Sequence, residues 1–142
     1  MLNKILFGGE TGLSFIGNAG VALLRIFSGV AMALGHGLSK VPPGEGLIER
    51  TAQMGFPAPS LFAWAAALSE FGGGILLALG LFTRISAAFI AFTMLVAFAG
   101  VHISDPFAAQ EKSLLYLFIG IAFLLTGSGD WSLDSFFRKE DR

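Results

Sequence analysis

The sequence lacks cysteine altogether and carries few charged residues. None of its 142 residues is cysteine, and only 13% are Asp, Glu, Lys or Arg, against about a quarter in an average soluble domain. The missing thiol excludes disulfides, thiol–disulfide catalysis, iron–sulfur clusters and thiolate zinc sites. The shortage of charge argues against a water-soluble globule.

Two further absences narrow the classes of function. The formal net charge is -1 and the sequence has no basic patch, so we expect no nucleic-acid partner. The sequence also contains neither a GxGxxG nor a GxxxxGK[ST] motif, although glycine is abundant. The common nucleotide-binding fingerprints are therefore excluded.

The chain is instead rich in long apolar stretches. Four of them, at 19–39, 61–81, 85–104 and 108–128, contain only 4 of the 19 charged residues. About 20 residues at a helical rise of about 1.5 Å cover a hydrocarbon core of roughly 30 Å. We therefore predict an all-α polytopic membrane protein, in which residues 1–142 form a single domain built as an antiparallel four-transmembrane-helix bundle.

The longest predicted connection, residues 40–60, has prolines at both ends, in the runs 42–44 and 55–59. Because proline breaks helices, the segment between these runs has room for a short amphipathic helix in the membrane interface. Its apolar residues would be Leu47, Ile48 and Met54. We expect this loop to cap one end of the bundle.

The other connections are short. A tight turn at 81–84 forces the second and third spans into a helical hairpin, and Asp105 and Pro106 can cap and begin the fourth span. The glycines in 127–129 end that span and leave residues 129–142 as a short tail. Such an up-down arrangement places both termini on one side of the membrane.

The basic residues in the loops predict the orientation. The terminal side carries Lys4, Arg84, Arg138, Lys139 and Arg142, and the opposite side carries Lys40, Arg50 and Lys112. Because positively charged loops stay in the cytoplasm, this count of five against three favours cytoplasmic termini.

Small residues recur at helical spacing within the spans. They are Gly29, Ala33, Gly37, Ala66, Gly74 and Gly120. In lipid, apolar burial does not drive helices together, so small side chains that allow close backbone approach do this instead. The pattern fits either a face for homo-oligomers or packing within a single bundle.

Ionisable residues at membrane depth are costly and usually face the protein interior. Arg25 and His36 lie on one face of the first span, about 16 Å apart along the helix, and Glu70 is the deepest carboxyl group. Connectivity brings four more residues to the end of the bundle where His36 lies, namely Lys40, His102, Glu111 and Lys112. We predict a polar ligand-binding cavity formed by Arg25, His36, Lys40, Glu70, His102 and Glu111.

Structural interpretations compete with this cavity. Arg25 and Glu70 can form a buried ion pair with each other, the two histidines can bond to headgroups or carbonyls, and the lysines can snorkel. At the terminal end, Arg84 and Asp134 can form an ion pair that holds the C-terminal segment. Alternatively, Ser132 caps a short terminal helix with Asp134 in its first turn.

Metal and haem sites gain no support from residue spacing. His36 and His102 with Glu70 or Glu111 supply suitable ligand types, but no HxxxH or ExxH motif is present. We therefore expect no metal site.

Several runs together resemble the DoxX family of small four-helix membrane proteins. They are Gly55-Phe56-Pro57, Leu68 to Gly74, Leu79 to Arg84, and Gly127 to Asp134, together with Arg25, Gly29, Gly35, Lys40, Glu111, Leu115 and Tyr116. The similarity extends from about residue 19 to about residue 135. By position, Arg25, Lys40, Glu70 and Glu111 match the polar pattern of the family, whereas His36 and His102 are proposed from their placement only.

The resemblance implies a protein of the bacterial inner membrane that associates with redox complexes. Relatives are similar to small subunits of thiosulfate:quinone oxidoreductases, and others are linked to oxidative-stress and thiol-handling assemblies. The leading hypothesis is an accessory subunit whose cavity binds a quinone or similar amphiphile, with any thiol chemistry located in a partner. The alternatives are a non-catalytic scaffold or amphiphile-binding protein and an independent metal-dependent enzyme.

Overall fold

The computed structural model describes residues 6–9 and 11–139, and these form helices and loops with no strand. Four long helices are α2 (Phe15–Met32), α4 (Pro59–Leu79), α5 (Thr83–Ala97) and α6 (Phe107–Thr126). The short helices are α3 (Glu45–Gln53) and α7 (Asp134–Lys139). Single π or 3-10 turns continue two of the long helices, as η1 (Ala33–Gly37), η2 (Leu38–Lys40) and η3 (Phe98–His102).

Four helices are long and apolar enough to cross a membrane, as predicted. With their terminal turns they cover Phe15–Lys40, Pro59–Leu79, Thr83–His102 and Phe107–Thr126. The first begins earlier than expected because Ser14 caps it, accepting a hydrogen bond from the backbone N–H of Gly17 at 3.1 Å. The chain is an integral membrane protein.

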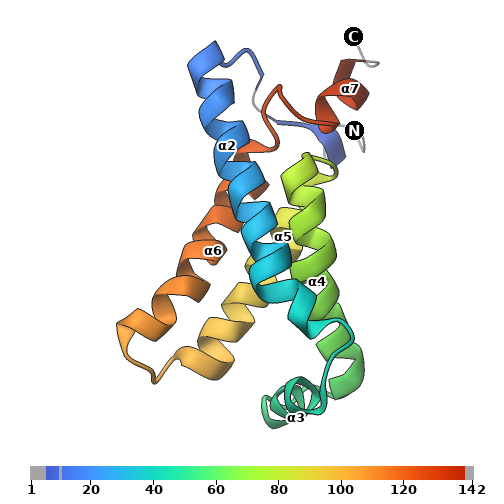
Figure 1. The fold of residues 1–142 in the computed structure, drawn as a ribbon, viewed down its shortest axis with the longest axis vertical. Coiled ribbons are helices and arrows are strands. Elements are labelled where there is room, and N and C mark those ends of the chain that lie inside the picture. Colours follow the sequence, from blue (N-terminus) through green and yellow to red (C-terminus); the bar gives the residue numbers. More distant parts are fainter. Residues whose placement is uncertain (1–5, 10, 140–142) are drawn as a thin grey trace.

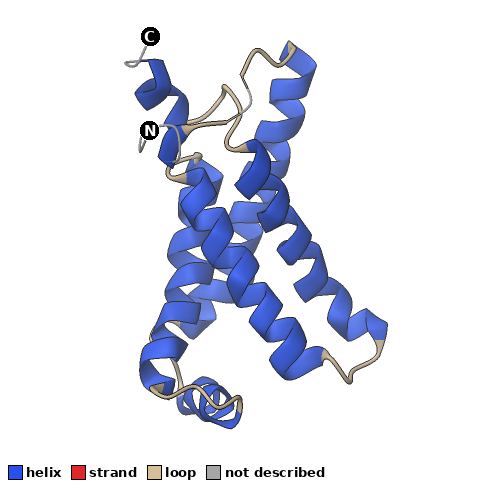
Figure 2. Cartoon of the chain, turned by 180° about the vertical axis from the view of Figure 1, so that it is seen from behind, coloured by secondary structure: helices blue, strands red, loops and turns tan. Residues whose placement is uncertain are grey.

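The long helices run up and down, and each end of the bundle has a distinct set of connections (Figures 1 and 2). The start of α2, the turn at residues 80–82 and α7 lie at one end, here called the terminal end. The α3 segment lies at the opposite end, here called the loop end (Figure 1). Of the basic residues counted for orientation, Lys4 and Arg142 lie outside the described residues.

The small residues singled out in the sequence pack helices of the same chain together. A Cβ on Gly29 would lie 2.5 Å from the backbone nitrogen of Ala78, and one on Gly120 would lie 2.9 Å from the Cβ of Ala91. Gly37 lies equally tightly against the backbone of Phe71. The α2–α4 and α5–α6 contacts are thus made backbone to backbone, which confirms packing within one bundle.

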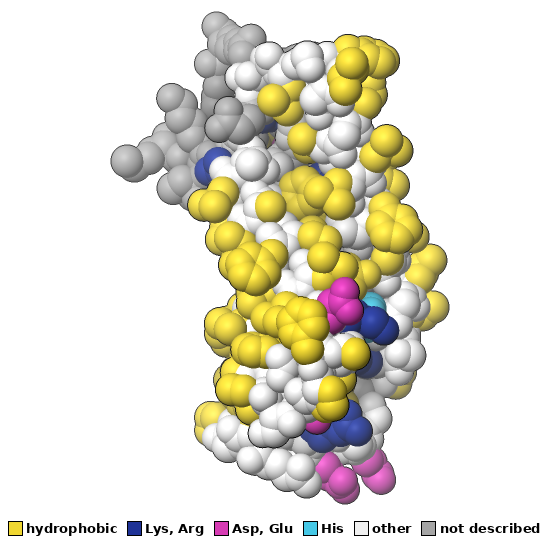
Figure 3. Space-filling view, turned by 90° about the vertical axis from the view of Figure 1, so that its left-hand side faces the viewer, with side chains coloured by type: hydrophobic (Ala, Val, Ile, Leu, Met, Phe, Trp, Pro, Cys, Tyr) yellow, Lys and Arg dark blue, Asp and Glu magenta, His cyan; other side chains and the backbone are white. Residues whose placement is uncertain are grey.

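Large apolar side chains cover the outside of this bundle. Phe15 and Ile16 are 75% and 81% exposed, whereas alanines such as Ala63 and Ala87 are fully buried. One face of the molecule carries its charged side chains mainly in its lower part, below a broad apolar region (Figure 3). This distribution suits a protein whose surroundings are lipid.

The predicted short helix between the proline runs is present as α3, which includes Leu47 and Ile48 and ends at Gln53, with Met54 at its C-cap. The predicted start of the fourth span is wrong by one residue. Pro106 occupies the cap position and Phe107 begins α6, with no side-chain cap. Asp105 is unavailable for capping because its carboxylate lies 2.8 Å from Nδ1 of His102.

Candidate functional site

Arg25 lies at the terminal end and does not contact Glu70. Its guanidinium is buried and donates to three backbone carbonyls: Nη1 to Leu77 and Ala78 at 3.2 and 3.1 Å, and Nη2 to Trp131 at 2.7 Å. The predicted Arg25–Glu70 ion pair is therefore wrong. The physical reason is that the guanidinium lies among carbonyls of α4 and of the folded-back C-terminal segment, which accept from Nη1 and Nη2, while its Nε has no partner among the described residues.

Asp134 holds the same end together, again through the backbone. Its carboxylate accepts hydrogen bonds from the N–H groups of Phe82 and Thr83 at 2.8 and 3.0 Å. The predicted Arg84–Asp134 ion pair is also wrong, since Arg84 donates instead to the carbonyl of Leu125 at 3.0 Å. The alternative was that Ser132 caps a short terminal helix with Asp134 in its first turn. It holds in part, since Asp134 begins α7 and Ser132 Oγ accepts from the N–H of Ser135.

The loop end contains a true ion pair within the membrane span. Lys40 Nζ lies 2.7 and 2.6 Å from the two carboxylate oxygens of Glu70. The Glu70 side chain is 3% exposed and that of Lys40 is 34% exposed. The lysine thus reaches inward to a buried carboxylate and does not snorkel to the headgroups.

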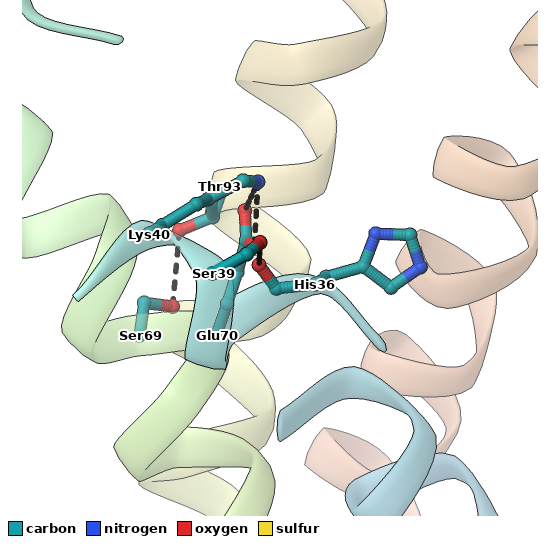
Figure 4. Close-up of polar contacts among 6 residues, drawn as sticks. All are labelled: His36, Ser39, Lys40, Ser69, Glu70 and Thr93. Atoms are coloured by element: carbon teal, nitrogen blue, oxygen red, sulfur yellow. Dashed lines mark hydrogen bonds and ion pairs between the residues drawn. The ribbon is translucent and has the colours of Figure 1, made fainter. Parts of the chain in front are cut away.

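Local helix geometry brings these two groups together. The π turn η1 precedes Lys40 and the 3-10 turn η2 ends at it, and they change the direction in which its side chain leaves the helix. Gly37 packs on the backbone beside Glu70, so the two helices approach closely at this level. Figure 4 shows Lys40 extending over Glu70 from the end of the first span.

A cavity of about 340 Å³ adjoins this pair, bounded by α3, α4, α5 and η3. Aromatic side chains form much of its apolar wall: Phe56, Phe62, Phe89 and Phe92. Its polar lining consists of Lys40, Arg50, Thr51, Ser69, Glu70, Thr93 and His102. The cavity therefore combines an apolar interior with a small, mainly basic polar group around a single carboxylate.

The structure places three of the six predicted cavity residues in its lining, namely Lys40, Glu70 and His102. Arg25 lies at the opposite end of the bundle, and Glu111 is exposed on α6 outside the lining. His36 points away from the ion pair (Figure 4) and stacks edge-on against Tyr116, with ring centroids 5.5 Å apart. The predicted set of six is thus divided among four places.

Hydroxyl groups that the sequence analysis missed complete the polar wall. Thr93 Oγ1 donates to Ser69 Oγ at 3.0 Å, which links α5 to α4 directly beside Glu70 (Figure 4). Thr93 is a polar residue in the middle of an apolar span, and this feature of the sequence could have identified it. Arg50 and Thr51 enter the lining from α3, whose placement depends on tertiary packing.

Chemically, the cavity presents hydrogen-bond donors and one acceptor capable of taking a proton. The Lys40 ammonium and the His102 ring can donate to a carbonyl oxygen, and the Glu70 carboxylate can accept a proton. Among the described residues no group of three or more His, Asp or Glu side chains is arranged to hold a metal ion. The arrangement suits a neutral or weakly anionic polar head attached to an apolar body.

Comparison with known proteins gives consistent matches. Residues 20–103 match the family model described as DoxX. The chain is 37% identical over 121 residues to a Bacillus subtilis protein named "Putative oxidoreductase CatD", an alignment covering 84% of this chain and 88% of that protein.

A second relative is a Haemophilus influenzae protein named "Uncharacterized protein", 37% identical over 82 residues, which cover 52% of this chain and 61% of that protein. No solved structure matches the chain. All residues that line the cavity fall within the segment matched by the family model.

Proposed function

The chain belongs to the DoxX family of membrane proteins, and on that premise we propose that it is a subunit of a membrane redox complex that binds a quinone or similar amphiphile. The observation that carries the proposal is the Lys40–Glu70 ion pair on the wall of a mainly apolar cavity. Ionisable groups are expensive at membrane depth and mark functional sites there. A relative named as an oxidoreductase supports the redox assignment.

The two charged groups match the needs of a quinone head. A bound quinone supplies two-electron, two-proton chemistry at two ring oxygens. Lys40 can donate a hydrogen bond to one ring oxygen, and Glu70 can take a proton from the reduced form. The Ser69 and Thr93 hydroxyls beside Glu70 can orient the head.

Size and lining agree with this assignment. A volume of about 340 Å³ lies at the lower end of the range of about 300–1,000 Å³ for small-molecule sites. Phe62, Phe89 and Phe92 offer aromatic faces against which a flat ring can pack. The cavity is therefore suited to the head of such a molecule, with no room for the whole amphiphile.

In this proposal electrons enter or leave through another protein. The chain has no cysteine and hence no iron–sulfur ligands. We therefore place the electron carrier, and any thiol chemistry, in a partner subunit of the complex. In this proposal the protein resides in the bacterial inner membrane with both termini in the cytoplasm.

The test is quinone binding by the purified chain in lipid nanodiscs. We would add decylubiquinone, measure bound ligand by native mass spectrometry, and extract any quinone that copurifies. Wild type should retain one equivalent, and Glu70→Gln should weaken binding by about tenfold or more. Glu111→Gln is the matched control, because Glu111 is exposed outside the cavity.

The opposite result would favour the alternative of a non-catalytic scaffold. If wild type binds no quinone, or if Glu70→Gln binds as well as wild type, the cavity assignment is wrong. The scaffold alternative relied on small-residue faces for partners. Those faces are occupied by helices of the same chain, so its partner surface would have to lie elsewhere.

A further inference from the structure

A second hollow lies on the outer side of α5 and adjoins the cavity. It is an open groove of about 480 Å³ lined by Arg84, Ile85, Ala88, Phe89, Phe92 and Leu124. Two of these residues, Phe89 and Phe92, also line the cavity that contains Glu70. Their rings are 60% and 59% exposed. The groove and the cavity are therefore separated by the same pair of phenylalanines.

The two hollows differ in polarity along one helix. The cavity follows α5 from Phe89 to the loop end and contains the ion pair and the hydroxyl groups. The groove follows α5 from Phe92 toward the terminal end, and Arg84 is the only charged residue among the described residues that line it. From Thr93 to Arg84 the helix rises about 14 Å, which is nearly half of a hydrocarbon core of about 30 Å.

We propose that the groove holds the apolar tail of the amphiphile whose head lies in the cavity. This inference rests on the proposed function, because a head bound at Lys40 and Glu70 leaves a tail that must find an exit from the cavity. The exit past Phe89 and Phe92 leads onto a lipid-facing surface at membrane depth. The proposed ligand therefore has a polar head in the cavity and an apolar tail in the groove.

A phospholipid is the competing occupant of this groove. Its acyl chain would fill the same apolar wall, and its phosphate would bind at Arg84. Arg84 uses Nη2 to hold the carbonyl of Leu125, and its buried Nε has no partner in the described structure. The experiment therefore has to distinguish two occupants of the groove. The tail of a quinone would require Glu70 for its binding, whereas the acyl chain of a phospholipid would require Arg84.

The experiment is photolabelling with a decylubiquinone analogue that carries a diazirine at the end of its tail. The labelled chain, in nanodiscs, is digested and the modified residues are mapped by mass spectrometry. We expect labels to concentrate on α5 residues 84–92 and on Leu124, and to be lost from these positions in Glu70→Gln. In an Arg84→Gln background, labels on Phe89 and Leu124 should still depend on Glu70.

A steric variant supplies a second readout. Ala88 lines the groove but not the cavity, so Ala88→Trp should block the exit and weaken decylubiquinone binding by about tenfold, or about 1.4 kcal/mol. Binding of the same quinone ring without a tail should not change. Ala122→Trp is the matched control, since Ala122 is exposed on α6 and lines neither hollow. If Ala88→Trp does not fold, Ala88→Ile narrows the same groove with a smaller side chain.

Each outcome has a defined meaning. The groove assignment would be overturned if labels spread over all spans, or if Ala88→Trp bound decylubiquinone as well as wild type. In either case, binding that depends on Glu70 would still support the proposed function. Groove labelling that responds to Arg84→Gln but not to Glu70→Gln would assign the groove to phospholipid. Failure of wild type to bind either quinone would remove the proposed function and the groove assignment with it.

Discussion

The two ends of the bundle treat buried charge differently. At the terminal end, the side chains of Arg25 and Asp134 bond to backbone groups, and these bonds join the C-terminal segment to the spans and α2 to α4. At the loop end, Lys40 and Glu70 bond to each other and adjoin a cavity. The charges at the terminal end therefore stabilise the fold, whereas those at the loop end line a cavity that a ligand can enter.

The comparison shows why burial of a charge alone does not identify a site. Arg25 and Glu70 are equally buried, each 2% exposed. What separates them is the partner: backbone carbonyls at one end, and at the other a partly exposed lysine ammonium beside a cavity. The contrast predicts that variants at the terminal end lower stability and that variants at the loop end lower ligand binding. Variants with the opposite effects would contradict it.

The largest effect should come from Arg25→Met. This change leaves the carbonyl of Trp131 without a donor and removes the tie between the spans and the C-terminal segment. Hydrogen bonds to charged groups contribute about 1.5–3 kcal/mol each, so we expect a loss of roughly 3 kcal/mol. Thermal unfolding in nanodiscs measures it, with the exposed Lys112→Met as control. If Arg25→Met is as stable as Lys112→Met, the Arg25 hydrogen bonds do not stabilise the terminal end.

A smaller loss should follow from Gly80→Ala. Gly80 has φ 67°, which disfavours any residue with a Cβ, and that Cβ would collide with Nη1 of Arg25. We expect a cost of about 1–3 kcal/mol from the strained backbone and the displaced guanidinium, measured by the same unfolding assay. Gly20→Ala is the control, because a Cβ there meets open space. If the two alanine variants unfold alike, the Arg25 contacts do not hold the terminal end.

The loop end should tolerate loss of its charges when both are removed together. Replacing a buried ion pair by apolar residues is often neutral, so Lys40→Met with Glu70→Leu should keep stability within about 1 kcal/mol of wild type. The single Glu70→Leu variant leaves the lysine unpaired and should be less stable. Quinone binding should be lost in both variants. A strongly destabilised double variant would make this pair structural, like Arg25.

The smallest effect is expected for His36→Phe. The ring that packs edge-on against Tyr116 is preserved, and position 36 does not line the cavity. Unfolding should change by less than about 0.5 kcal/mol, and quinone affinity should stay within about twofold. A tenfold loss of quinone affinity would instead show that His36 contributes to the binding site.

The sequence was sufficient to predict the spans, the hairpin turn and α3, because lipid thickness and proline positions set them. It could not predict which partner each charge takes. Matching Arg25 to Glu70 by depth ignored Trp131, which reaches Arg25 only after the C-terminal segment folds back. The placement of Arg25 and His36 on one helix face assumed a constant 100° per residue, which does not hold where the π turn η1 interrupts the α-helix before His36.

The Arg25 network also has a consequence for the order in which the protein is made. Arg25 enters the bilayer with the first span, but its carbonyl partners belong to Leu77, Ala78 and Trp131, which the ribosome synthesises later. Chains emerge N-terminus first, and a lone guanidinium at membrane depth is costly. We therefore expect a nascent or truncated chain to present an unsatisfied charge, which would mark it for chaperones or proteases until synthesis reaches Trp131.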